Sequence, residues 1–291
     1  MESTLARTTD VPALDTIADA LSKGVRRVYD AAGPAGQQAK NAAHGVWLGH
    51  PLHPVFTDIP IGAWTTALAM DAAADGDPGM HRAATFAMGV GLAGALGAAV
   101  TGLTDWSETQ GESRRTGLVH GLLNIAATTL MAAAWLQRRQ HRGARGRACA
   151  WTGLAIAAGS AYIGGDLVYR QRVGVTHATE ELPDGFLAVA GSDELADNAM
   201  MCVRAGEAHV LLVRQHGTLH ALAHACAHLG GPLSEGTLKD GSVVCPWHAS
   251  EFRLEDGRVL NGPSTHDQPR YDVRERDGRI EVKAQAVSVS P

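Results

Sequence analysis

Cys226-Ala227-His228, followed after sixteen residues by Cys245-Pro246-Trp247-His248, is the stretch that decides how this chain is interpreted. Each short segment supplies one thiolate and one imidazole. Zinc sites usually pair Cys with Cys and His with His at short spacing, so this order does not favour zinc. Four such groups in loops flanked by Gly and Pro are also not a packing pattern. The order fits a [2Fe–2S] centre in which two His replace two Cys on one iron.

Residues around these two segments extend the pattern. Leu229-Gly230-Gly231 follows the first pair, Ala249-Ser250-Glu251-Phe252 follows the second, and Asn261-Gly262-Pro263 lies further on. Over residues 186–285 the chain resembles the Rieske family. The resemblance implies a compact antiparallel β domain with one [2Fe–2S] cluster per chain. By this resemblance the cluster ligands are Cys226, His228, Cys245 and His248. The residues expected next to the cluster are Leu229, Pro246, Ser250 and Phe252.

Departures from the respiratory Rieske pattern indicate the subtype. Gly231 and Trp247 stand where respiratory members carry two disulfide-bonded Cys, and Phe252 stands where they carry a Tyr. Ser250 keeps the other hydroxyl that bonds the cluster. Hydrogen bonds to sulfur raise the potential, so a redox titration should place it in the lower half of roughly −150 to +300 mV. The sequence is similar to ferredoxins of aromatic-ring dioxygenases and to nitrite-reductase-like small subunits.

The first half of the 291-residue chain has a different composition. Apolar stretches occupy about 55–75, 83–104, 117–136 and 149–168. About 20 apolar residues are needed to cross a hydrocarbon core, and four such runs in succession predict four transmembrane helices. Small residues would let these helices approach closely, namely Gly89, Gly91, Gly94 and Gly97. Interfacial aromatics are expected at the helix ends, namely Trp64, Trp106, Trp135 and Trp151. The alternative is a soluble bundle of Ala-rich helices.

A second resemblance supports the membrane interpretation. The run His50-Pro51-Leu52-His53-Pro54 is similar to a motif of an uncharacterised family of small four-helix bacterial membrane domains. The fold class expected is therefore an N-terminal all-α transmembrane four-helix bundle followed by an all-β Rieske-type domain. We expect a polar N-terminal arm over 1–45, the membrane domain over 46–177 and the Rieske domain over 178–291. The arm is either an amphipathic helix, on the bilayer or on the protein, or a flexible segment.

Polar residues converge on one face of the predicted bundle. The starts of the first and third helices share a membrane face with the ends of the second and fourth. This places together His53, His120, Asp58 and Asp166. Ionisable groups near membrane segments suggest a functional site, here for haem, quinone or a metal. The alternative is a set of helix caps and ion pairs, such as Asp166 with Arg170 at helical spacing.

Charge counts give a direction for the bundle in a bacterial inner membrane. Nine Lys and Arg, including distant ones, lie on the side of the C-terminal domain, against six on the other side. This count predicts a cytoplasmic Rieske domain. The alternative is a twin-arginine export signal at Arg138-Arg139, which would carry the folded cluster outward.

The expected function is one-electron transfer between a redox partner protein and a membrane quinone or oxidoreductase, with lipid around the bundle. A redox or iron–sulfur sensor that signals through the bundle is the alternative. Oxygenase activity needs a second iron held by two His and a carboxylate, and only His266 follows the ligands. Whether the chain itself is an enzyme is left open. The slightly acidic balance gives no support for nucleic-acid binding.

Overall fold

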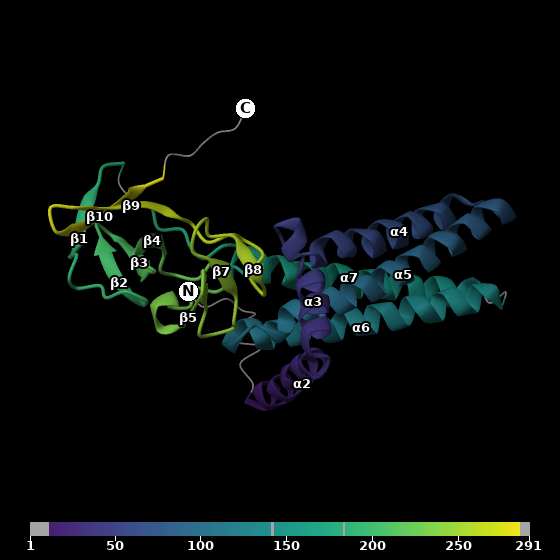
Figure 1. Ribbon diagram of the computed structural model, residues 1–291. Helices are drawn as coiled ribbons and strands as arrows, with labels where there is room; N and C mark the ends of the chain where they lie inside the picture. The colour runs from purple at the N-terminus through teal and green to yellow at the C-terminus, as the bar shows by residue number, and fades with distance from the viewer. Residues whose placement is uncertain (1–11, 141–142, 183, 286–291) are drawn as a thin grey trace. The chain divides into compact units, whose positions relative to one another are not determined.

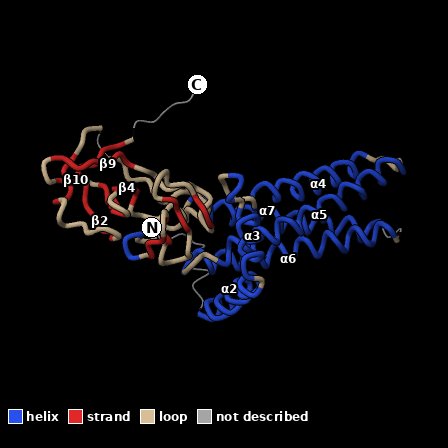
Figure 2. The backbone as a smooth tube through the Cα atoms, viewed as in Figure 1, coloured by secondary structure: helices blue, strands red, loops and turns tan. Residues whose placement is uncertain are grey.

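The computed structural model describes residues 12–140, 143–182 and 184–285. The first eleven residues of the predicted N-terminal arm lie outside this range. The chain divides into two compact units. One comprises residues 1–44 and 51–173, and the other comprises residues 45–50 and 174–291. The first unit is helical and the second is mostly β-structure (Figure 2).

Long helices build the first unit (Figure 1). In its described residues they are α2 Pro12–Ala31, α3 Gly33–His44, α4 His53–Ala73, α5 Pro78–Ser107, α6 Gly111–Arg139 and α7 Gly143–Tyr169. Short connections join α4 to α5 and α6 to α7, so each pair forms a helical hairpin. The last four helices coincide with the four apolar stretches of the sequence. By length and composition, α5 and α6 are the two described helices that could cross a membrane.

Glycines on α5 determine how closely α4 approaches. A Cβ atom built on Gly94 would lie 2.5 Å from Ile59 Cγ2, and one on Gly97 would lie 2.4 Å from Phe56 Cδ1. Real Cβ contacts essentially never fall under 3.0 Å, so larger residues would separate the helices. The close approach predicted from these small residues is therefore present.

Trp64 corrects the expectation of an interfacial ring. It lies in the middle of α4, is 4 % exposed, and packs where a Cβ on Gly91 would be 2.3 Å from its Nε1. Trp151 on α7, by contrast, is 56 % exposed. Both tryptophans lie in apolar stretches, so the sequence does not distinguish them. The packing of α4 on α5 decides that the ring of Trp64 is covered.

The arm that precedes α4 folds on the protein. The Tyr29 hydroxyl on α2 lies 2.7 Å from Thr104 Oγ1 on α5, and Lys40 Nζ on α3 lies 2.5 Å from Glu108 Oε1. Glu108 is only 2 % exposed, so Lys40 neutralises a buried carboxylate. Of the alternatives for this segment, the structure shows helices packed against the bundle.

The second unit consists of short antiparallel strands. They are β1 Leu187–Gly191, β2 Ala199–Ala205, β3 Ala208–Gln215, β4 Thr218–Ala223, β5 Thr237–Lys239, β6 Ser242–Val244, β7 Glu251–Arg253, β8 Val259–Asn261, β9 Tyr271–Arg276 and β10 Arg279–Ala284. They pair in the orders β1-β10-β9, β2-β3-β4 and β5-β6-β7-β8. Gly217, Gly257 and Gly278 turn the chain with positive φ, as turn glycines do. An antiparallel β domain is the fold that the sequence predicts.

Candidate metal centre

Two loops carry the predicted ligands, and they close in the same way. The first follows β4, where the Cys226 amide donates to the Gly231 carbonyl at 2.8 Å and the Gly230 amide to the Cys226 carbonyl at 2.8 Å. The second joins β6 to β7 and forms the equivalent pair of bonds from Cys245 to Ser250 and from Ala249 to Cys245, at 2.8 and 3.2 Å. Each loop is therefore a small closed ring that begins at its cysteine.

The four candidate donor side chains differ in exposure by type. Cys226 is 1 % and Cys245 is 4 % exposed, whereas both histidines are partly exposed. The imidazole rings of His228 and His248 lie 5.1 Å apart between centroids, at an interplanar angle of 88°. The two cysteine sulfurs thus lie on the buried side of the site, and the two imidazole rings lie on its solvent-facing side. None of the four cysteines is joined to another by a disulfide.

The two buried sulfurs interact directly, and backbone amides point at them. A hydrogen bond from Cys226 lowers the pKa of Cys245 to about 7, assisted by the amides of Trp247 and His248. The same neighbouring sulfur, together with burial, raises the pKa of the Cys226 thiol. Hydrogen bonds from the backbone amides of His228 and Leu229 act against this and lower the pKa of Cys226. N–H groups aimed at sulfur stabilise the thiolate, which is the form that binds metal.

Gly231 and Trp247, at which the sequence resemblance places the respiratory disulfide, are in contact. A Cβ on Gly231 would lie 3.1 Å from Trp247 Cγ and 2.8 Å from Cys245 Sγ. The indole therefore rests on a bare backbone beside the second cysteine. Trp247 itself is 52 % exposed, and Pro246 before it is also exposed. Packing of a large ring on a glycine joins the two loops here.

Gln268 is the residue of this site that sequence reasoning missed. Its Oε1 accepts the Ala227 amide at 2.9 Å, and its Nε2 donates to the carbonyls of Ala223 and Ala225, both at 2.7 Å. Gln268 is 1 % exposed and lies just before β9. One side-chain amide thus satisfies three backbone groups around the first ligand loop. A lone Gln forty-one residues away along the chain carries no local signal of this role.

The predicted neighbours Ser250 and Phe252 take different positions. The Ser250 hydroxyl oxygen accepts the Ser264 amide at 3.0 Å, which leaves its O–H proton available as a donor. Phe252 is fully buried on β7, paired with Val243 on β6. His224, two residues before the first ligand, has its Nε2 2.8 Å from Ser234 Oγ. It is therefore engaged with the loop that follows the first ligand pair.

The residues predicted on the membrane face separate into two groups. His53 and His120 meet inside the helical unit, with ring centroids 6.4 Å apart. Asp166 instead bonds Arg170 Nε at 2.7 Å, the ion pair that the sequence spacing predicts. Asp58 is exposed on α4. Among the described residues of the helical unit, no group of three or more His, Cys, Asp or Glu is placed to hold a single metal ion.

Two family descriptions match this chain. "Predicted membrane protein (DUF2231)" matches residues 49–177, and "Rieske [2Fe-2S] domain" matches residues 185–272. The chain belongs to the Rieske [2Fe–2S] proteins, and its Rieske domain binds a [2Fe–2S] cluster. The donor set of two buried thiolates and two imidazoles fits such a cluster.

Several of the relatives are ferredoxin components of oxygenase systems. The ferredoxin component of the alkene monooxygenase system of Xanthobacter autotrophicus is 32 % identical over 96 residues, which are 33 % of this chain and 78 % of that protein. The anthranilate 1,2-dioxygenase ferredoxin subunit of Burkholderia cepacia is 31 % identical, over 31 % of this chain and 83 % of that one.

Two further matches cover a similar share of this chain. Human apoptosis-inducing factor 3 is 35 % identical over 33 % of this chain, and the chain spans only 16 % of that protein. The solved ferredoxin of carbazole 1,9a-dioxygenase from Nocardioides aromaticivorans IC177 is 22 % identical, over 34 % of this chain and 98 % of that one, with a TM-score of 0.33.

Replacing Gln268 by Ala should loosen the first ligand loop. Leaving a buried backbone group without a partner costs about 1–3 kcal/mol, so we expect the loss of three such bonds to cost at least about 3 kcal/mol of stability, together with bound iron. Iron content and the thermal midpoint of the full-length protein measure both effects. Gln215→Ala is the matched control, because Gln215 braces the Lys239–Gly241 turn with two similar bonds. The control should lose stability but keep its iron. A Gln268→Ala protein with full iron and an unchanged midpoint would contradict this role.

Proposed function

We propose that this protein is a membrane-anchored Rieske electron carrier, which passes single electrons between a redox partner and a membrane quinone or oxidoreductase. The observation that carries the proposal is the presence of a ferredoxin-type Rieske domain and a predicted membrane domain in one chain. Soluble ferredoxins diffuse between partners. A carrier joined to a membrane domain stays at the bilayer, where lipid-soluble electron donors and acceptors reside.

In this proposal Cys226 and Cys245 hold one iron, and His228 and His248 hold the other. When bound, the cluster supplies one-electron reduction and oxidation. Burial of the sulfurs opposes the charged thiolates, and the backbone amides directed at them act against this and favour the charged form. The two imidazoles lie closer to solvent, beside the exposed Trp247. Electrons would therefore enter and leave on the histidine side.

We further propose that α4 to α7 all cross the membrane. The support is the apolar outer surface of the helical unit, because a soluble bundle buries such side chains. Large exposed apolar residues occur on every one of these helices, including Val55, Ile61, Phe86, Leu96, Val100, Ile125, Trp151 and Tyr162. With a rise of 1.5 Å per residue, the 21 residues of α4 measure about 31 Å, close to the thickness of a hydrocarbon core.

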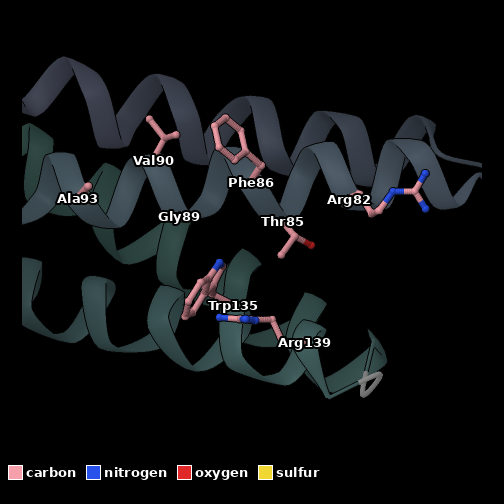
Figure 3. A pocket seen from close by; sticks show the side chains of 8 residues that line it. All are labelled: Arg82, Thr85, Phe86, Gly89, Val90, Ala93, Trp135 and Arg139. Atoms are coloured by element: carbon pink, nitrogen blue, oxygen red, sulfur yellow. The ribbon is translucent and has the colours of Figure 1, made fainter.

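A groove on α5 and α6 indicates where this apolar surface ends (Figure 3). Phe86, Val90 and Ala93 line it along α5, with Trp135 from α6 opposite Gly89. Its other end carries Arg82 and Arg139, and the Arg139 guanidinium lies 4.8 Å from the Trp135 ring centroid. Arg side chains beside interfacial Trp are typical of the headgroup level. This end of the helices would lie at a membrane surface, in contact with lipid.

The twin-arginine alternative loses support from the position of Arg138. Its side chain is 8 % exposed and is paired with Asp71, which is 6 % exposed. An export signal has to be accessible to its receptor, whereas this arginine neutralises a buried carboxylate. We therefore retain the cytoplasmic side for the Rieske domain.

Ligand assignment predicts a specific spectroscopic result. Purified protein should contain two irons per cluster and give the rhombic low-field EPR signal of a Rieske centre, since mixed Cys and His ligation produces it. His248→Ala should abolish the signal. His224→Gln should retain it, because His224 lies near the loop but bonds Ser234. Zinc without iron after anaerobic purification would refute the assignment.

The carrier role predicts electron transfer from the membrane pool. In membranes that contain the protein, added quinol should reduce the cluster, with one electron taken up per cluster. We expect this because the membrane domain holds the Rieske domain at the bilayer. The EPR signal of the reduced cluster is the readout, and membranes with His248→Ala provide the background. A cluster that stays oxidised with quinol but is reduced by dithionite would favour the sensor alternative.

Four membrane crossings predict an alternating pattern of accessibility. Reporter fusions at Gln110 and at the C-terminus should lie on one side, which we expect to be the cytoplasm. A fusion at Gly143 should lie on the other side, because one helix separates it from each neighbour. The protein should also resist carbonate extraction. A chain that stays soluble without detergent would exclude the membrane bundle.

A further inference from the structure

Two histidines inside the helical unit are fixed in the same tautomer. Nδ1 of His53 on α4 lies 2.9 Å from the Ala98 carbonyl on α5, and Nδ1 of His120 on α6 lies 2.8 Å from the Ser160 carbonyl on α7. A carbonyl only accepts, so each Nδ1 carries the proton and each Nε2 carries a lone pair. Histidines that bind metals usually donate their other N–H in this way, often to a backbone carbonyl.

The arrangement occurs once in each helical hairpin. Gly102 follows Ala98 by one helical turn, and Gly164 follows Ser160 by one turn. A Cβ on Gly102 would lie 2.6 Å from Cε1 of His53, and one on Gly164 would lie 3.1 Å from Cε1 of His120. Both rings thus lie against bare helix backbone. A lone helix cap would not explain the same histidine, carbonyl and glycine set in both hairpins.

The two rings are spaced like ligands on opposite sides of one metal. Their centroids are 6.4 Å apart and their planes are at 89°. A metal–nitrogen distance of about 2 Å plus a ring radius of about 1.2 Å gives about 6.4 Å for two opposed imidazoles. The pair in the Rieske domain, proposed to share one iron from neighbouring positions, is closer at 5.1 Å.

We propose that His53 and His120 are the two axial ligands of a haem. Within the described residues no third His, Cys, Asp or Glu completes a metal cluster here, so a bare ion would have two protein ligands. A haem brings four nitrogens of its own and leaves two opposed positions on the iron, which two imidazoles can fill. Its apolar ring suits a helix bundle, where cofactor sites form between side chains of facing helices.

Asn124 marks the acceptor atom of the second histidine. Its Nδ2 lies 3.0 Å from Nε2 of His120, one turn further along α6. The amide therefore donates to the lone pair that iron would take, and it would be displaced when haem binds. The helical unit would then carry a one-electron centre of its own, a property that does not depend on the role proposed for the Rieske domain.

The test is the haem content of the full-length protein, produced with iron and a haem precursor. Wild type should show one haem per chain by the pyridine haemochrome assay and the absorption and EPR signals of low-spin bis-imidazole iron. His53→Ala and His120→Ala should each lose the low-spin signal, and added imidazole should restore it. His81→Ala is the matched control, because His81 belongs to the same unit but pairs with Asp71. It should keep the haem.

The Rieske EPR signal in the same samples shows that the variants are folded. Haem-free wild type with an intact Rieske signal would overturn the proposal while leaving the proposed carrier function in place. Low-spin haem retained in both histidine variants would also overturn it. One copper or zinc per chain, lost in the two variants and without haem, would replace haem by a two-histidine metal site.

Discussion

Contact between the two buried sulfurs of Cys226 and Cys245 is the constraint around which the second unit is organised. The two residues lie in different loops, and each loop closes on its own cysteine with the same pair of backbone bonds. Gln268 then fixes the first loop, and Trp247 on Gly231 joins it to the second. Because thiolates this close repel one another, the surrounding amides and a metal centre are needed to hold both of them charged.

The outer surface of the helical unit carries Phe, Leu, Val and Ile side chains that a soluble bundle would bury. Between the helices lie an apolar cluster that includes Trp64, Met88 and Met131, small residues and paired polar groups. Glycine spacing brings α4 onto α5 closely enough for the ring of Trp64 to fill the interface. Buried charges are neutralised in pairs, as with Glu108 and Lys40, or Asp71 and Arg138. This distribution suits lipid as the surrounding solvent, where packing and polar pairing replace the hydrophobic effect.

Two pairs of histidines, one in each unit, differ in ways that suit the different metal centres proposed for them. The Rieske pair lies on adjacent loops with partly exposed rings at 5.1 Å, beside buried sulfur. The helical pair lies on two separate helices at 6.4 Å, and backbone carbonyls orient both rings. In both cases the spacing of the rings, rather than the presence of histidine, carries the chemical information.

The ligand loops could be predicted from sequence because all their determinants are local: a cysteine, a histidine two or three residues on, and the glycine or alanine that lets the loop close. Apolar runs and alternating strands likewise indicated the helices and most strands. The spacing of apolar residues within one short segment is enough to show which of its faces is buried. Gln268, the burial of Trp64 and the carbonyl partners of His53 and His120 could not be predicted. Each depends on which distant segment packs alongside, and only the tertiary structure decides that.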